Sequence, residues 1–363
     1  MSHSWVALHP SPKGVVQFIG GAFFGTFFPT IWYQHLLKSI FLEQEYTIIV
    51  LPFGFTIRHW GQALNLLIEQ YKIRAEIIKK IDSELQSFKK NQAKEIHEKK
   101  KTLEKALKTY KQDSNYIWLG HSLGSKYISL LEILSVDDSL EKVIENARQA
   151  TSNSEVFNRK KFTPKLKNIE KKLEEAYSEW EKLKKLVGSQ HPFIRNQPSL
   201  LMSPDFSGTK SIVFPLLSKI LVGRIPVVGH FVKGIERFFD QVVDAPENEC
   251  GVVPTTEQTK HLVKYGNQEL DLFNLTAVIS FEKDKIAGNA QDKIMKGTKE
   301  ESDVYWLVNE QLNNKLFGKN QNLYYEIKGA NHFEPIAIKL SDMRGLEEKV
   351  IDFLDAIAEK QKT

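Results

Sequence analysis

The sequence predicts an α/β fold, in which a mostly parallel sheet is covered by helices on both faces. Strand-like and helix-like segments alternate along much of the chain. The strand-like segments Val15–Gly20 and Tyr46–Leu51 are apolar on both faces, which is typical of strands buried within a parallel sheet. In Tyr116–Tyr127 the pattern predicts a buried strand, a very tight turn and the start of a helix. Other segments are helical and charged, and these predict insertions into the α/β core.

The composition is that of a soluble globular protein. The chain has 363 residues, which is enough for one large domain with insertions. Its formal net charge of +5 could indicate an anionic partner. However, the lysines alternate with glutamates along helical stretches, as in Lys165–Lys185, and this pattern is typical of a solvated helix face. We therefore expect no nucleic-acid partner.

Three features predict a cytoplasmic location. Cys250 is the single cysteine, so the chain can form no internal disulfide, which fits a reducing compartment. Residues 1–6 lack the basic and apolar regions of a signal peptide. No unbroken run of about 18 apolar residues exists, so we expect no transmembrane helix. Contact with a membrane surface stays open as an alternative, because of an apolar segment described below.

The first part of the core is expected in residues 1–134. Its strands follow from apolar runs and its helices from a 3–4 spacing of apolar residues. A long helical region, about 60–111, exceeds a simple crossover helix, so we expect an insertion that breaks near Asn91 or projects from the body. The predicted elements are strands at Trp5–Pro10, Val15–Gly20, Tyr46–Leu51 and Tyr116–Leu119, and helices at Thr30–Leu42 and from the tight turn to about Leu134.

Residues 135–250 are expected to hold two further insertions. Asp137–Ser189 is helical and charged with a heptad-like apolar spacing, and it predicts an arm packed on the earlier long helix. This arm is an ordinary insertion or a docking site for a protein partner. Ser199–Pro204 predicts a strand that returns to the sheet. Ser211–Val243 is very apolar but interrupted by proline and glycine, which fits a lid over a lipophilic pocket, helices on a membrane surface or helices packed into the body.

The alternation of strands and helices resumes in residues 251–363, which are expected to complete the core. The order is helix, strand, helix, strand and terminal helix. The predicted ranges are Thr256–Tyr265, Leu275–Phe281, Asp303–Asn313, Asn322–Ile327 and Gly345–Lys360.

The tight turn carries the motif Gly120-x-Ser122-x-Gly124. A strand that reverses directly into a helix leaves no room for side chains beside the serine, so small residues must flank it. Ser122 would then stand at the tip of a strained elbow with its hydroxyl exposed. The amide of Leu123 falls at the helix N-terminus, where unpaired donors favour negative charge. That amide would form one half of an oxyanion hole.

The other half of the oxyanion hole is expected in the loop after the strand Val15–Gly20. Two successive glycines, Gly20 and Gly21, allow a close approach of the backbone there. The second donor would be the amide of Ala22 or of Phe23. Loss of one such donor costs about 2.7–4 kcal/mol of transition-state stabilisation in a comparable site.

A serine hydroxyl needs a base that takes its proton. His332 follows the last predicted strand, after a turn at Gly329-Ala330, and so lies at the sheet edge that carries the elbow. The other nine histidines lack this context. His121, within the elbow, is expected to point its side chain elsewhere.

The base in turn needs an acid that fixes its tautomer. Asp284 follows the strand that ends at Phe281, and the order serine, aspartate, histidine is the one expected for this type of sheet. Glu282 and Asp205 are competitors, because each also follows a predicted strand. Asp284 is the favoured acid.

The motifs resemble those of a known family. Phe18–Phe23, Leu51–Phe53, Gly120–Gly124, Phe281–Asp284 and Asn331–His332 are similar to a cyanobacterial and plastid family described as a domain of unknown function. The core as a whole resembles an α/β-hydrolase. The resemblance covers the core and not the helical insertions. It implies the α/β-hydrolase fold and a serine-hydrolase site, and it implies no substrate.

These observations lead to two functional hypotheses. The first is an esterase-like or lipase-like serine hydrolase that uses Ser122, His332 and Asp284 on a lipophilic acyl ester, with no metal or organic cofactor. An apolar pocket is expected from aromatic residues beside the elbow, namely Phe24, Phe27 and Phe28. The second hypothesis is a non-catalytic hydrolase scaffold whose helical arm or lid binds a protein partner or a membrane surface.

Overall fold

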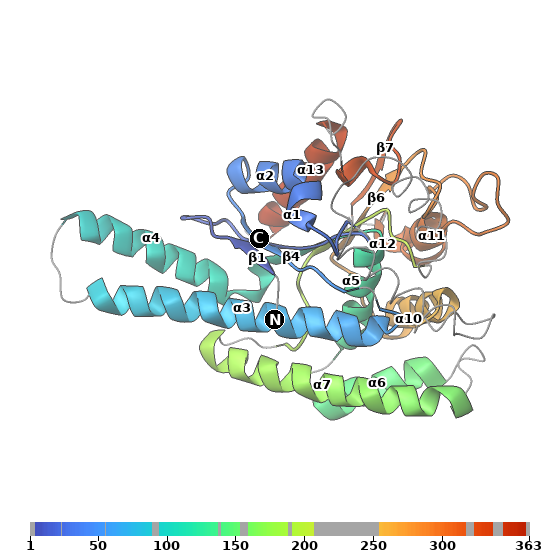
Figure 1. The fold of residues 1–363 in the computed structure, drawn as a ribbon, viewed down its shortest axis with the longest axis horizontal. Helices are drawn as coiled ribbons and strands as arrows, with labels where there is room; N and C mark the ends of the chain where they lie inside the picture. Colours follow the sequence, from blue (N-terminus) through green and yellow to red (C-terminus); the bar gives the residue numbers. More distant parts are fainter. Residues whose placement is uncertain are drawn as a thin grey trace, which may run out of the picture.

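A seven-stranded sheet organises the molecule (Figure 1). The computed structural model describes residues 4–22, 24–54, 56–88, 94–136, 139–152, 159–187, 191–206, 254–316, 323–336 and 344–360. The strand order is β1-β3-β2-β4-β5-β6-β7, and only β1 is antiparallel to its neighbour. The strands are β1 Trp5–Ala7, β2 Val15–Ile19, β3 Thr47–Val50, β4 Tyr116–His121, β5 Ser199–Met202, β6 Thr276–Phe281 and β7 Tyr324–Ile327.

This arrangement confirms the predicted α/β-hydrolase-like fold. Every residue of β2 to β6 is buried, as the continuous apolar runs predicted, whereas all three residues of the edge strand β1 are exposed. Because parallel strands share one direction, their carboxyl ends meet at a single edge of the sheet.

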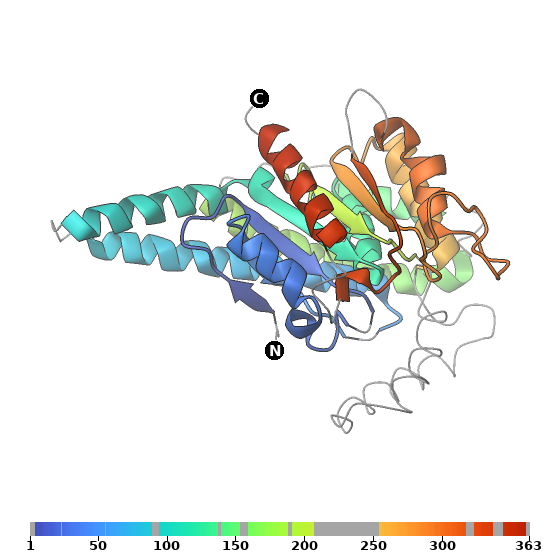
Figure 2. The same cartoon turned by 90° about the horizontal axis from the view of Figure 1, so that it is seen from above.

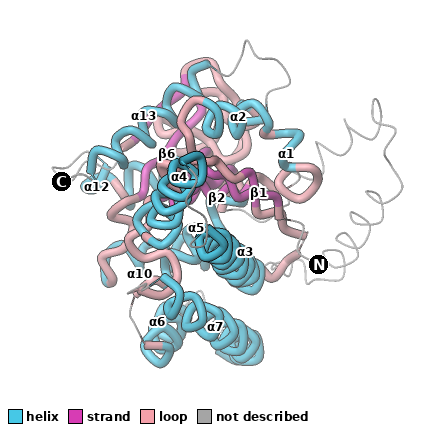
Figure 3. Tube along the Cα trace, turned by 90° about the vertical axis from the view of Figure 1, so that its left-hand side faces the viewer, coloured by secondary structure: helices cyan, strands magenta, loops and turns pink. Residues whose placement is uncertain are grey.

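Helices cover both faces of the sheet (Figure 3). One face packs against α2 and α13, and the other packs against α3, α5 and α10. Outside this second layer, α7 lies along α3 and beside α6 (Figure 1). These helices are α2 Gln34–Leu42, α3 His59–Phe88, α5 Leu123–Leu134, α6 Leu140–Ser152, α7 Arg159–Val187, α10 Thr256–Glu269 and α13 Arg344–Lys360.

The long insertion is a pair of helices, α3 and α4 Lys94–Lys111, which extend together beyond the sheet (Figure 2). The predicted break point, Asn91, lies outside the described residues. Buried Arg74 on α3 ties the pair to the core. Its guanidinium donates to the carbonyls of Tyr110 and Lys111 at 3.0 Å each and pairs with Asp113 at 2.6 Å, and it lies over the ring of Tyr116 at the start of β4.

The predicted helical arm packs on the earlier long helix, since α7 lies against α3. Leu173, Trp180 and Leu183 on α7 are buried in the same hydrophobic cluster as Leu66 and Ile77 of α3. The 3–4 spacing places these side chains on one stripe of the helix, which turns toward α3. The arm is therefore continuous with the core on that face of the sheet.

Two predicted helices are interrupted. The segment expected at Thr30–Leu42 forms α1 Pro29–Trp32 and α2, and Tyr33 breaks the helix between them. The segment expected at Asp303–Asn313 forms α11 Asp303–Tyr305, a π-helical turn at Trp306–Gln311 and α12 Asn313–Leu316. Interruptions of this kind are often found at functional positions.

The predicted lid, residues 211–243, lies outside the described residues. Of the helices that the structure describes, none has both the length and the apolar character needed to cross a bilayer.

We expect Trp180→Ala to lower the free energy of unfolding by about 3–5 kcal/mol, because it leaves a cavity between α7 and α3. The Trp180 side chain is only 1% exposed. Urea denaturation measures the loss. Lys182→Ala on the same helix, at a side chain that is 66% exposed, should change the value by no more than about 0.5 kcal/mol. Equal effects of the two substitutions would mean that α7 is not part of the cooperative core.

Candidate active site

The sequence-predicted site residues meet at the carboxyl edge of the sheet. Ser122 follows β4, Asp284 follows β6, His332 follows β7 and Ala22 follows β2. A very small pocket is lined by three of these residues, Ala22, Ser122 and His332. Its lining residues are Gly21, Ala22, Phe24, His121, Ser122, His332, Phe333 and Ile336.

The elbow has the strained geometry that the motif predicted. Ser122 adopts φ 54° and ψ −120°, a backbone conformation that costs of the order of 1–3 kcal/mol for a residue other than glycine. A Cβ atom at Gly124 would lie 2.1 Å from the carbonyl oxygen of Ile19, and one at Gly120 would lie 2.8 Å from the amide nitrogen of Ser125. The requirement for small residues on both sides of Ser122 is thereby confirmed.

The expectation that the Ser122 hydroxyl is exposed was wrong, because the elbow is enclosed by the residues that line the pocket and Ser122 is buried. The hydroxyl has no hydrogen-bond partner among the described residues. Ser122 and His332 line the same pocket, but the expected bond between them is not formed in this structure. Bonds between nucleophile and base are often long when no substrate is bound. Neither the amide of Leu123 nor that of Ala22 is bonded to an acceptor in the described part of the chain.

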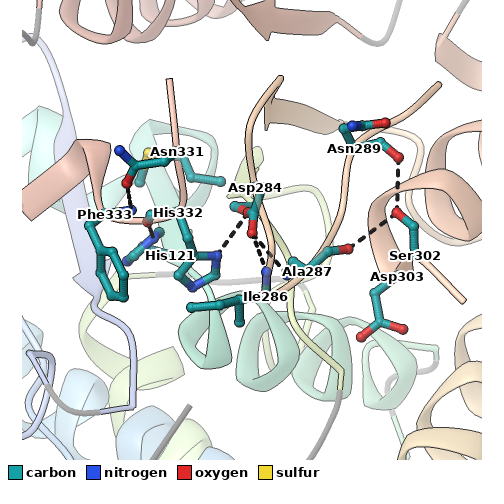
Figure 4. Close-up of polar contacts among 12 residues, drawn as sticks. His121, Asp284, Ile286, Ala287, Asn289, Ser302, Asp303, Asn331, His332 and Phe333 are labelled. Carbon is teal, nitrogen blue, oxygen red and sulfur yellow. Dashed lines mark hydrogen bonds and ion pairs between the residues drawn. The ribbon is translucent and has the colours of Figure 1, made fainter. Parts of the chain in front are cut away.

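Asp284 holds His332 in one orientation (Figure 4). His332 Nδ1 donates to Asp284 Oδ2 at 2.8 Å. The other carboxylate oxygen, Oδ1, accepts from the amides of Ile286 at 2.7 Å and Ala287 at 3.0 Å. These bonds fix the carboxylate in the loop after β6, so that it presents Oδ2 to the imidazole.

Ser203 supplies a fourth donor to Asp284, and sequence reasoning missed it. Its hydroxyl donates to Asp284 Oδ2 and lies 3.2 Å from His332 Nδ1. Ser203 follows β5 directly and has φ 46°. Its position at the carboxyl end of a predicted strand was the only signal in the sequence.

The pKa values of His332 and Asp284 are shifted in opposite directions. Burial alone would lower the pKa of His332, but the charge and hydrogen bond of Asp284, together with the charge of Asp205, outweigh burial and raise it above 6.5. Burial alone would raise the pKa of Asp284, but the charge of His332 and the bonds from His332, Ser203 and Ile286 lower it. Asp284 is therefore ionised at neutral pH and stabilises an imidazolium at His332.

The two competing acids have other partners. Glu282 accepts from the amide of Gly329 at 2.7 Å and so braces the turn before His332. Asp205 donates from its backbone amide to the Ser122 carbonyl at 3.4 Å. Its charge acts on His332 and also on buried Lys126, whose pKa is lowered to about 7 by burial, in part against the charges of Asp205 and Asp303.

The expectation for His121 was wrong. Its side chain lines the pocket, and its ring centroid is 5.0 Å from that of His332. His121 is the last residue of β4, where side chains alternate between the two faces of the sheet. Gly120 faces α5, so His121 faces the side that carries α2 and the loop of His332.

The aromatic residues that were expected to form the pocket do not all line it. Phe24 lines the pocket, whereas Phe27 and Phe28 are not among the lining residues, and Phe28 is 56% exposed at the start of α1. Phe23 lies outside the described residues. The rest of the apolar wall comes from Phe333 and Ile336, which directly follow His332 in sequence and which sequence reasoning did not single out.

The described residues contain no group of three or more histidine, cysteine, aspartate or glutamate side chains placed to hold a metal ion. The chemistry that the described arrangement can support is that of a serine nucleophile with a histidine base.

Ser203→Ala should lower the free energy of unfolding by about 1.5–3 kcal/mol at pH 7, because an ionised carboxylate loses a donor. The folded-state pKa of Asp284 lies below its unfolded value, so this stabilisation is present above the unfolded pKa and fades as the pH falls. Urea denaturation should therefore show that the free energies of unfolding of the variant and the wild type differ less at acidic pH than at neutral pH. Ser129→Ala removes a hydroxyl bonded only within α5 and should show no such pH dependence.

Three solved structures are similar in fold to this chain. Protein TT1662 from Thermus thermophilus is 12% identical, with 98% of this chain and 93% of that chain covered and a TM-score of 0.39. Esterase B from Lactobacillus rhamnosis is 11% identical, with 97% and 78% covered and a TM-score of 0.41. A lipase-esterase related protein from Clostridium acetobutylicum is 11% identical, with 97% and 99% covered and a TM-score of 0.40. Likeness at this level carries no information on activity.

No curated protein matches the chain. A family model does match it, over residues 1–196. The matched span includes the loop at Gly20–Gly21, the α3–α4 pair and the Ser122 elbow. The chain therefore belongs to the family described as "Protein of unknown function (DUF1350)".

Proposed function

We propose that this protein is a serine hydrolase that cleaves a lipophilic acyl ester through an acyl-enzyme. The observation that carries the proposal is the pocket in which an unpartnered Ser122 hydroxyl, on a strained elbow, lies beside His332. His332 in turn is bonded through Nδ1 to the ionised carboxylate of Asp284. A nucleophile, a base and an orienting acid are the three groups that acyl transfer by a serine requires.

The proposed reaction has two steps. Ser122 Oγ attacks the ester carbonyl carbon while His332 takes the hydroxyl proton, and the alcohol leaves with that proton. Water then attacks the acyl-serine, with His332 again as base, and releases the acid and Ser122. Asp284 stabilises the imidazolium in both steps, since it stays ionised.

The proposed oxyanion hole consists of the amides of Leu123 and Ala22. Leu123 is the first residue of α5, a helix of 12 residues, so its amide has no partner within the helix. Ala22 lines the same pocket as Ser122. The preference for a lipophilic acyl group rests on the apolar wall of Phe24, Phe333 and Ile336.

The wild-type protein should react covalently with a fluorophosphonate probe, and Ser122→Ala should not. Intact-mass spectrometry would detect one adduct per chain, and peptide mapping would place it on Ser122. Ser125→Ala is the matched control, since its hydroxyl already donates to the carbonyl of Gly120 and faces away from the pocket lining. A folded wild-type protein that stays unlabelled would refute the hydrolase proposal and favour the non-catalytic scaffold with a docking arm.

Labelling should slow as the pH falls through the pKa of His332, because only the neutral imidazole accepts the Ser122 proton. That pKa lies above 6.5, so the inflection should too. In Asp284→Asn the charge that raises this pKa is absent, so the inflection should move to lower pH and the plateau rate should fall by about 10⁴-fold. Labelling rates across a pH series measure both effects.

Asp271→Asn is the control for the loss of one carboxylate, since the Asp271 side chain is 87% exposed and lies before β6, away from the pocket. It should leave the inflection and the plateau unchanged. An Asp284→Asn profile that coincides with the wild-type profile would exclude Asp284 as the orienting acid.

A further inference from the structure

A chain of three hydrogen bonds joins the two loops that flank Ser122. The amide of Gly21 donates to the hydroxyl oxygen of Tyr33 at 2.8 Å. The Tyr33 hydroxyl lies 2.8 Å from His121 Nδ1. His121 Nε2 lies 2.9 Å from the carbonyl oxygen of His332. The chain thus runs from the loop after β2, through the elbow, to the loop after β7.

The proton positions along this chain follow from its ends. A carbonyl oxygen only accepts, so His121 Nε2 must carry the proton that bonds the carbonyl of His332. Burial and the charge of His332 lower the pKa of His121 to about 3, so the ring is neutral and carries one proton. His121 Nδ1 is therefore an acceptor, and the Tyr33 hydroxyl donates to it. Every donor in the chain has one acceptor.

The side chains that form this chain of hydrogen bonds are buried. Tyr33 is 0% exposed, His121 is 1% exposed and His332 is 3% exposed. Tyr33 owes its position to the break between α1 and α2, which allows its side chain to reach Gly21 and the end of β4. A Cβ atom at Gly21 would lie 3.2 Å from His121 Nδ1 and 3.4 Å from the Tyr33 hydroxyl, so the three groups are in close contact.

We infer that Tyr33 and His121 are positioning residues that hold the Gly21–Ala22 loop and the backbone of His332 at fixed places on either side of Ser122. This inference rests on the proposed hydrolase function for its catalytic consequence. Asp284 fixes the imidazole of His332 from one side, and His121 fixes its main chain from the other. The amide of Gly21 is occupied by Tyr33, and the next residue, Ala22, lines the pocket.

Such positioning matters because Ser122 itself contributes no bond that would hold the base. A displacement of about 1 Å in a catalytic group can cost 10²-fold in rate. Without the Tyr33 hydroxyl, the neutral ring of His121 is free to place its proton on either nitrogen. One of the two tautomers then turns a lone pair toward the carbonyl of His332 and loses the bond.

The test compares Tyr33→Phe with Tyr127→Phe. Tyr127 is also 0% exposed, but its hydroxyl has no hydrogen-bond partner among the described residues, so its loss removes the same atom without removing a described bond. With a fluorophosphonate probe, Tyr33→Phe should lower the maximal inactivation rate by roughly 10-fold to 10²-fold and leave the probe concentration at half-maximal rate nearly unchanged. Tyr127→Phe should behave as the wild type. Equal maximal rates for Tyr33→Phe and the wild type would overturn the inference.

A second measurement does not depend on activity. In ¹⁵N-labelled wild-type protein, NMR should show His121 as a neutral ring protonated at Nε2, and a downfield Nδ1 proton for His332 bonded to Asp284. Tyr33→Phe should change both signals, and Tyr127→Phe should change neither. Should the wild type fail to react with the probe, the proposed function falls while these signals still decide the inference: unchanged signals in Tyr33→Phe would overturn it.

If Tyr33→Phe does not fold, two substitutions at His121 take its place. In His121→Gln the amide nitrogen can still donate to the carbonyl of His332, whereas His121→Leu fills the space without any donor. The glutamine variant should keep an inactivation rate at least several-fold higher than that of the leucine variant. Equal rates in the two folded variants would contradict a positioning role for His121.

Discussion

The site depends on one close approach, that of the first turn of α5 to the end of β2. The α-carbon of Gly124 lies so near the carbonyl of Ile19 that no side chain fits between them. This contact places the start of a helix beside the loop at Gly21–Ala22 and forces Ser122 into a left-handed conformation at the tip of the turn. The proposed oxyanion hole, formed by the amides of Leu123 and Ala22, depends on this contact. A larger residue at position 124 would separate the two halves of the proposed oxyanion hole.

Those parts of the fold that depend on local patterns could be predicted from the sequence. Continuous apolar runs identify the buried strands, and the 3–4 spacing in α3 and α7 identifies the side of each helix that packs. The positions of Ser122, Asp284 and His332 follow from a single rule, since each lies in the turn or loop after a strand whose carboxyl end is at the same edge of the sheet. Of the three acids that follow strands, the preferred one, Asp284, is bonded to His332 Nδ1, and its role as the orienting acid stays a prediction.

The residues that sequence reasoning missed depend on long-range geometry. His121 bonds to the carbonyl of a residue 211 positions away, and Ser203 bonds to a carboxylate 81 positions away. Tyr33 lies in a segment whose apolar spacing predicts one continuous helix, and nothing local indicates that the helix breaks there. Phe28 was expected beside the elbow in the fold, but its side chain is exposed at the start of α1.

The α3–α4 pair has a consequence for the connection between β3 and β4. The two helices pack against each other, and Arg74 on α3 bonds to the carbonyls of Tyr110 and Lys111, just before β4. The chain beyond Arg74 therefore runs out along α3 and returns along α4 to the level from which it left. The length of this outer part of the insertion has no effect on where β4 begins.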